Sequence, residues 1–91
     1  MKINRNFCVR EIAGDFILVP VGEAALEFSG IITTNEVGAL IWETLQQDVT
    51  MEQLVQKITD EFEIDSKTAQ SDAEEFVQRL KSLGLLDEKS N

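Results

Sequence analysis

The chain has 91 residues, 43% of them hydrophobic, which suffices for one domain with its own core but leaves little volume for an enclosed active site. It carries 8 Lys and Arg residues against 17 Asp and Glu, a net charge of −9, and a field of that sign disfavours nucleic acids and anionic membrane surfaces as partners. Histidine is absent, which excludes catalysis by an imidazole and metal sites with imidazole ligands.

The N-terminal segment and the single cysteine bear on the compartment. The first residues contain no apolar stretch of the kind found in signal peptides, and the longest apolar run, residues 16–21, is far shorter than the roughly 20 residues that span a bilayer. Cys8 is the single cysteine, so it has no partner for an internal disulfide, and without a histidine in the chain no imidazole can activate its thiol. We therefore expect a cytoplasmic protein that does not bind membranes.

The first third of the chain is typical of β-structure. Residues 7–12 and 16–21 are rich in β-branched and aromatic side chains, and the short turn over 13–15 contains a glycine free to take positive φ, so the two segments predict a hairpin. A third strand is expected over residues 24–33, with a bulge at Gly30. As the last strand of a meander it would be an edge strand, with one row of backbone N–H and C=O groups open to another chain.

The run over residues 31–42 predicts that a strand passes directly into a helix. Thr33 and Glu36 have the spacing of a capping box, so the helix is expected over about residues 35–46, beginning near Asn35. Gly38 costs about 1 kcal/mol relative to alanine inside a helix unless it permits close packing. We therefore expect Gly38 to contact another backbone element.

Two further helices are predicted after short connections. The first of them begins after Thr50, because Thr50 and Gln53 again have the spacing of a capping box. The second is expected over about residues 66–83 and ends at Gly84, a residue suited to the left-handed position after a helix. Because the connections are short, the helices must pack together as one unit. The last residues, 87–91, are predicted to be a polar tail.

Several segments of the chain together resemble the PqqD family and the related peptide-recognition domains of ribosomal-peptide biosynthesis. These segments are FILVP, GIITTNEVGALIW, TMEQLVQKITDEFEID and DAEEFVQRLKSLGLLDE, in the order and spacing of the family. The resemblance covers roughly residues 7–88. It implies an α+β fold that is winged-helix-like, with a three-stranded antiparallel sheet followed by a three-helix bundle, in a single domain over residues 1–91.

The resemblance also implies a function. Members of the family are non-catalytic modules, without a cofactor or metal, that bind the leader segment of a ribosomally made precursor peptide. They present the peptide to a modifying enzyme, often a radical S-adenosylmethionine protein. The groove of the family lies between the third strand and the third helix, where an extended peptide adds to the open sheet edge and pockets read alternate side chains.

The candidate site follows from a helical projection of residues 66–83. At about 100° per residue, Val77 lies to one side of the apolar stripe and Arg79 to the other. We hypothesise that small side chains of the helix form an apolar floor, that the third strand contributes larger ones, and that Arg79 pairs with an acidic leader residue. In the competing interpretation the apolar members are ordinary core residues. The predicted peptide-binding residues are Leu26, Phe28, Ile32, Ala69, Ala73, Val77 and Arg79.

Other functions remain compatible with the sequence. A docking or regulatory subunit of an enzyme or transporter could use the edge strand or Trp42 as its anchor without handling a peptide, and the same edge could pair two copies in a homodimer. A winged-helix DNA-binding regulator fits less well, because residues 65–81 carry more carboxylates than basic side chains. The acidic residues near Asp60 lack the alternating oxygen ligands of a calcium loop, so no metal site is expected.

Overall fold

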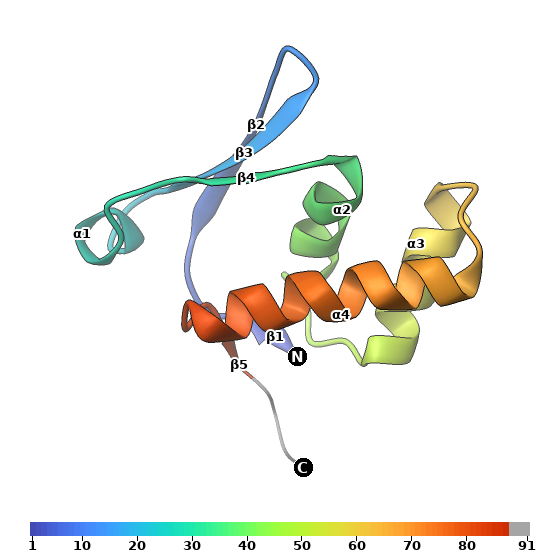
Figure 1. The fold of residues 1–91 in the computed structure, drawn as a ribbon. Coiled ribbons are helices and arrows are strands. Elements are labelled where there is room, and N and C mark those ends of the chain that lie inside the picture. Colours follow the sequence, from blue (N-terminus) through green and yellow to red (C-terminus); the bar gives the residue numbers. More distant parts are fainter. Residues whose placement is uncertain (88–91) are drawn as a thin grey trace.

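The computed structural model describes residues 1–87 and has the mixed α+β architecture that the sequence predicts. Figure 1 shows the strands β2, β3 and β4 on one side and the long helix α4 beside α2 and α3 on the other. The elements, in chain order, are β1 (Lys2–Ile3), β2 (Phe7–Ile12), β3 (Asp15–Pro20), α1 (Ala24–Glu27), β4 (Ile32–Thr34), α2 (Glu36–Thr44), α3 (Met51–Glu61), α4 (Ser66–Ser82) and β5 (Leu86–Asp87).

The strands β2 and β3 form the predicted hairpin. Their register runs from Phe7 opposite Pro20 to Ile12 opposite Asp15, so the turn contains two residues rather than three. Ala13 has φ of 52° and Gly14 has φ of 86°, the left-handed pair that a tight hairpin turn requires. Two left-handed turn residues match the right-handed twist of the strands, which explains why the hairpin closes here.

The predicted third strand over residues 24–33 is wrong in its first half. Ala24–Glu27 forms the short helix α1, and only Ile32–Thr34 pairs with β3, through Ile32 opposite Leu18 and Thr34 opposite Phe16. The sequence Ala-Ala-Leu-Glu favours a helical turn. A hydrogen bond of 2.9 Å from the Phe28 N–H to the Ala24 carbonyl closes this turn. Gly30 therefore precedes the strand and does not form a bulge within it.

The transition from β4 to α2 differs in detail from the expected capping box. The Asn35 side chain accepts a hydrogen bond from the Gly38 N–H at 2.9 Å, so Asn35 is the N-cap and Thr33 belongs to the strand. A Cβ added to Gly38 would collide with the side chain of Thr34. The close approach at Gly38 is therefore made to a side chain of β4, not to the backbone that we expected.

The ends of α3 and α4 agree with the sequence. The Gln53 N–H donates to the Thr50 hydroxyl at 3.1 Å, and the Thr50 N–H donates to the Gln53 side chain at 2.9 Å, which confirms the capping box. The Asp65 carboxylate caps α4 by accepting from the Thr68 N–H at 2.7 Å. At the other end Gly84 has φ of 74°, and the Leu85 N–H returns to the Leu80 carbonyl at 3.0 Å, as in a Schellman cap.

A second sheet, which the sequence did not reveal, joins the two ends of the described chain. Lys2 pairs with Asp87 and Ile3 pairs with Leu86. The Ile3 N–H also donates to the Leu45 carbonyl at 2.9 Å, so β1 is held by α2 as well. The core therefore includes Ile3, and Asp87 is part of a strand and not of the predicted polar tail. The rest of the predicted tail, 88–91, lies outside the described residues.

The core lies where α2, α3 and α4 meet β3 and the β1–β5 pair. Trp42 is only 2% exposed and packs edge-to-face on Phe7, with ring centroids 5.2 Å apart. It is therefore not available as the surface anchor considered for a docking subunit. No helix within residues 1–87 has the length and apolar character that crossing a bilayer requires. The largest fully buried side chains are Trp42, Leu18, Ile41, Leu45, Leu54, Ile58, Leu80 and Leu85.

Candidate functional site

A groove of about 280 Å³ lies between the segment leading into β4 and the C-terminal end of α4. We call it the β4–α4 groove. Its walls are mainly apolar, and Ile31 and Leu83 remain 56% and 42% exposed although both are large hydrophobic side chains. Exposed apolar side chains that face a concave surface are typical of a binding site. The lining residues are Phe7, Phe28, Ser29, Gly30, Ile31, Ile32, Arg79, Ser82, Leu83 and Leu85.

A smaller hollow of about 160 Å³ continues along α4, and we call it the α2–α4 hollow. It is bounded by the β4–α2 junction on one side and by Asp72, Glu75 and Phe76 of α4 on the other. Arg79 lines this hollow and also the β4–α4 groove, so it stands at the boundary between them. The two hollows differ in charge, because carboxylates line the smaller one and apolar side chains dominate the larger one.

Arg79 also contacts the backbone of β4. Its Nη1 donates a hydrogen bond to the Thr33 carbonyl at 3.3 Å. The strand order is β2-β3-β4, so β4 has a strand partner on one side only within residues 1–87. The ladder between β3 and β4 has three pairs, and Thr33 opposite Ile17 is the middle one. In a three-pair ladder whose two outer pairs exchange the N–H···O bonds, the N–H and C=O of the middle residue point away from the partner strand. The Thr33 carbonyl, which accepts from Arg79 of α4, therefore belongs to the open side of β4. The open edge and the apolar groove therefore lie next to each other.

One protein family matches most of this chain. The family model described as coenzyme PQQ synthesis protein D (PqqD) matches residues 16–86. The chain belongs to the PqqD family. The match runs from β3 into β5 and includes every residue that lines the β4–α4 groove except Phe7. It confirms the family that the sequence segments indicate.

A solved structure has the same fold as this PqqD-family chain. The structure described as "TbiB1 in Complex with the TbiA(beta) Leader Peptide" is similar over 100% of both chains, with a TM-score of 0.68 and 23% sequence identity. Among curated proteins no match was found. The similarity extends over the full length, so it includes the N-terminal strands that the family match leaves out.

The structure brings together some of the predicted site residues and separates others. Phe28, Ile32 and Arg79 line the β4–α4 groove of this PqqD-family member. Leu26 lies on α1, is 88% exposed and lines a different hollow beside Arg5. The groove therefore contains residues of both predicted elements, but Leu26 is outside it because α1 replaces the expected strand.

The three small residues expected to form the floor of the groove lie in the core instead. Ala69 and Ala73 are fully buried and Val77 is 3% exposed, and none of them lines the β4–α4 groove. The helix turns its other flank, which carries Asp72 and Arg79, toward β4. Small side chains on a helix allow a neighbouring helix to approach closely, and α3 packs against α4. The interpretation of these residues as ordinary core is the one that matches their burial.

Sequence reasoning missed two exposed residues that line the groove. Ile31 falls within the predicted strand and Leu83 within the predicted last helix, but neither is among the predicted peptide-binding residues. A signal was present for Ile31, because Ile31 and Ile32 are adjacent, and adjacent side chains of an extended segment point to opposite faces. Only one of them can enter the core, and the structure buries Ile32. The side chain of Ile31 therefore stays exposed and lines the groove.

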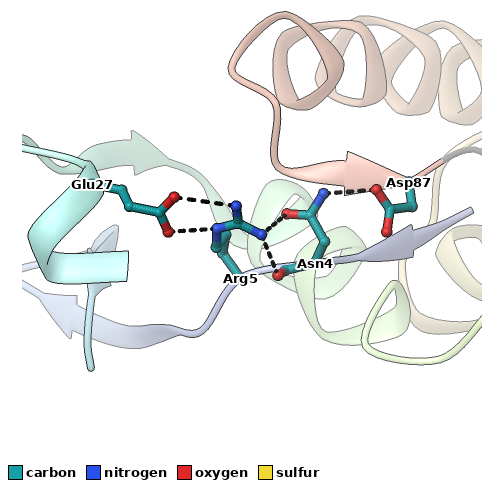
Figure 2. A network of polar contacts seen from close by, with 4 residues as sticks. All are labelled: Asn4, Arg5, Glu27 and Asp87. Atoms are coloured by element: carbon teal, nitrogen blue, oxygen red, sulfur yellow. Dashed lines mark hydrogen bonds and ion pairs between the residues drawn. The ribbon is translucent and has the colours of Figure 1, made fainter. Parts of the chain in front are cut away.

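A polar network holds one wall of the groove in place (Figure 2). Arg5 donates to both oxygens of the Glu27 carboxylate, at 2.7 and 3.2 Å, and to the Asn4 carbonyl at 3.0 Å. Asn4 in turn donates to Asp87 at 2.8 Å. The hydrogen bond and charge of Glu27 raise the pKa of Arg5. Because Glu27 directly precedes Phe28, the network ties the groove wall to the β1–β5 sheet.

The groove has few polar side chains. Its polar side chains are two serines and one arginine, and no carboxylate lines it. Throughout residues 1–87, no three His, Cys, Asp or Glu side chains gather as they would around a metal ion. An extended apolar segment with a free backbone is the kind of ligand that fits these walls and the adjacent strand edge.

Proposed function

We propose that this protein is a non-catalytic module that binds the leader segment of a ribosomally made precursor peptide and presents it to a modifying enzyme. The observation that carries the proposal is the open edge of β4 beside an apolar groove. Membership of the PqqD family supports it. TbiB1, which has the same fold, forms a complex with a leader peptide.

The proposed mechanism combines strand addition with apolar capture. The peptide pairs with the free side of β4 and gains main-chain hydrogen bonds that do not depend on its sequence. β4 contains only Ile32–Thr34, so the edge offers few such bonds. Most of the binding free energy must then come from apolar side chains of the peptide that enter the β4–α4 groove. Specificity follows from the shape and charge of that groove.

Each proposed contact residue has a defined part. Phe28 and Ile32 form the wall on the strand side, and Ile31 and Leu83 cover the peptide from the two rims. Arg79 marks the end of the groove. The buried residues Ala69, Ala73 and Val77 act from behind by holding α4 in position. The partner enzyme that we propose is of the radical S-adenosylmethionine type, and the proposed compartment is the cytoplasm.

A titration with candidate leader peptides tests the proposal. Peptides encoded by short reading frames next to the gene are added to the isotopically labelled protein, and backbone amide shifts are followed by NMR. We expect saturable shifts confined to residues 28–34 and 79–85. If no peptide shifts these amides near millimolar concentration, and a partner enzyme broadens them instead, the protein is a docking subunit and the proposal is wrong.

A matched pair of variants makes the test specific to the groove. Leu83→Asp places a charge on the groove rim, and Ile12→Asp places the same charge on the β2–β3 hairpin, where Ile12 is 57% exposed. Both side chains are exposed, so both variants should fold. We expect the first to weaken peptide binding by at least about tenfold and the second to leave it unchanged. Equal loss in the two variants would show that the peptide does not occupy the groove. Size-exclusion chromatography of the free protein reports whether the β4 edge pairs two copies instead.

A further inference from the structure

Arg79 is bonded to a backbone carbonyl, although the protein is acidic. Two of the other cations, Arg5 and Lys57, each pair with a carboxylate, Glu27 and Glu61 respectively. Arg79 pairs with no carboxylate in the described part of the chain, and the hydrogen bond to the Thr33 carbonyl at 3.3 Å is its polar contact. A guanidinium has five N–H donors in a planar fork, so most of its donors are left to water.

The position of Arg79 relates these unused donors to the proposed binding site. The Thr33 carbonyl is an acceptor on the free side of β4, the side to which a peptide strand would add. A peptide N–H that takes this acceptor must displace the Arg79 guanidinium. The displaced guanidinium then remains beside the peptide, where the ligand and the apolar groove remove it from water. A charge that loses its hydration needs a partner of opposite charge.

We infer that Arg79 is a specificity-determining residue of the β4–α4 groove, which leaves the Thr33 carbonyl when a peptide adds to β4 and pairs with an Asp or Glu side chain of that peptide. The inference rests on the proposed function and names the class of ligand: an extended peptide with apolar side chains and one carboxylate at a fixed position. The carboxylate replaces the carbonyl as acceptor and can bind the fork through two hydrogen bonds.

The charges around Arg79 also restrict where the carboxylate enters. Among the described residues that line the β4–α4 groove, Arg79 alone is charged. Asp72 and Glu75 line the α2–α4 hollow, which lies on the other side of Arg79. A carboxylate that approached through the hollow would meet two like charges, while one that approaches from the groove meets none on the lining. The acidic residue of the peptide is therefore expected beside Thr33, on the groove side.

A display experiment tests this inference without a known ligand. A library of randomised 12-residue peptides is selected against the wild-type protein and against Arg79→Gln, Arg79→Lys and Arg10→Gln. Arg10 is exposed on β2, at the other side of the sheet, so Arg10→Gln removes the same charge away from the groove. We expect Asp or Glu to be enriched at one position with the wild type and Arg10→Gln. With Arg79→Gln that enrichment should fall about tenfold, and Arg79→Lys should retain part of it.

A double-mutant cycle then separates direct pairing from a general effect. One selected peptide is synthesised with its acidic residue and with the corresponding amide, and each is titrated against the wild type and Arg79→Gln. Either change alone should weaken binding about tenfold, and the second should add less than about twofold once the first is present. Additive losses would overturn the inference.

The remaining outcomes distinguish this inference from the proposed function. Peptides that bind the groove with no acidic preference, or with the same preference after Arg79→Gln, overturn the role of Arg79 and leave the proposed function standing. Uniformly tighter binding by Arg79→Gln would show that Arg79 only obstructs the edge, which also overturns it. Failure of every variant to enrich any peptide contradicts the proposed function itself.

Discussion

The two flanks of helix α4 have opposite properties. The flank with Ala69, Ala73 and Val77 lies in the core, whereas the flank with Arg79 is exposed and lines the groove. From sequence, the small residues suggested an accessible floor. Small side chains on a helix therefore mark a place where another element packs closely, whereas a binding surface is recognised by large apolar side chains that stay exposed.

A substitution at Val77 tests the burial of the first flank most directly. We expect Val77→Asp to unfold the protein, because an unpaired carboxylate would be buried at a cost of about 3–5 kcal/mol, a large part of the roughly 5–15 kcal/mol that stabilises a typical domain. Urea unfolding followed by circular dichroism measures the effect. Leu83→Asp, where the side chain is 42% exposed, is the control and should cost much less, about 1 kcal/mol, because the carboxylate stays in water. A stable Val77→Asp variant would place this flank on the surface.

The contact between β4 and α2 is the next most sensitive point. In Gly38→Ala the added Cβ would collide with the Thr34 side chain, so we expect a loss of about 1–3 kcal/mol despite the better helix propensity of alanine. Thermal unfolding measures it. Combining Gly38→Ala with Thr34→Ala should recover part of the loss, since the colliding hydroxyl and methyl are removed. If Gly38→Ala is stabilising, the strand and helix do not approach as described.

A smaller effect is expected from the Arg5–Glu27 pair, which tests whether the groove wall depends on the polar network. Arg5→Gln should leave global stability nearly unchanged, because the pair is exposed to solvent. It should speed amide hydrogen exchange over residues 24–31, since α1 loses its tie to the β1–β5 sheet. Lys57→Gln, which breaks the ion pair with Glu61 on α3, is the control and should not affect these amides. Unchanged exchange in Arg5→Gln would show that packing alone holds the wall.

The smallest effect is a pH dependence at the start of α4. Hydrogen bonds from the Thr68 backbone and side chain lower the pKa of the Asp65 carboxyl below its ordinary value of 3.8. A lowered pKa in the folded state means that Asp65 stabilises the fold above the ordinary value, and that this contribution is lost as the pH falls through the folded-state pKa. Asp65→Asn keeps a capping side chain but removes the titration. Free energies of unfolding measured from about pH 5 to pH 2 should fall less steeply in this variant. Parallel curves for the two proteins would show that the cap makes no pH-dependent contribution.

Local signals in the sequence were sufficient wherever a structure depends on neighbouring residues. The capping pair Thr50 and Gln53 and the left-handed Gly84 are found where expected. A groove does lie between the strand and the last helix, and Phe28, Ile32 and Arg79 line it. Each of these depends on residues a few positions apart or on the arrangement of a known family.

The errors arose where two local preferences compete or where distant residues meet. The alternation of apolar and polar side chains over residues 24–27 is weak, so the pattern allows either a strand or a helical turn. The helix propensity of these residues favours the turn, which the structure shows as α1. For α4, the apolar stripe was clear, but a projection cannot tell which of its two flanks faces β4. That choice depends on how α3 packs against the helix.

The α+β class, the hairpin and the helix that begins after Thr50 follow from propensity, capping and spacing along the chain. The family follows from the resemblance of longer segments in their order. Three features could be seen only in the folded molecule: the pairing of Lys2–Ile3 with Leu86–Asp87, the burial of Val77, and the hydrogen bond from Arg79 to the Thr33 carbonyl. These features join residues that are far apart in the chain. Their geometry is set by the packing of the whole core, which no local pattern encodes.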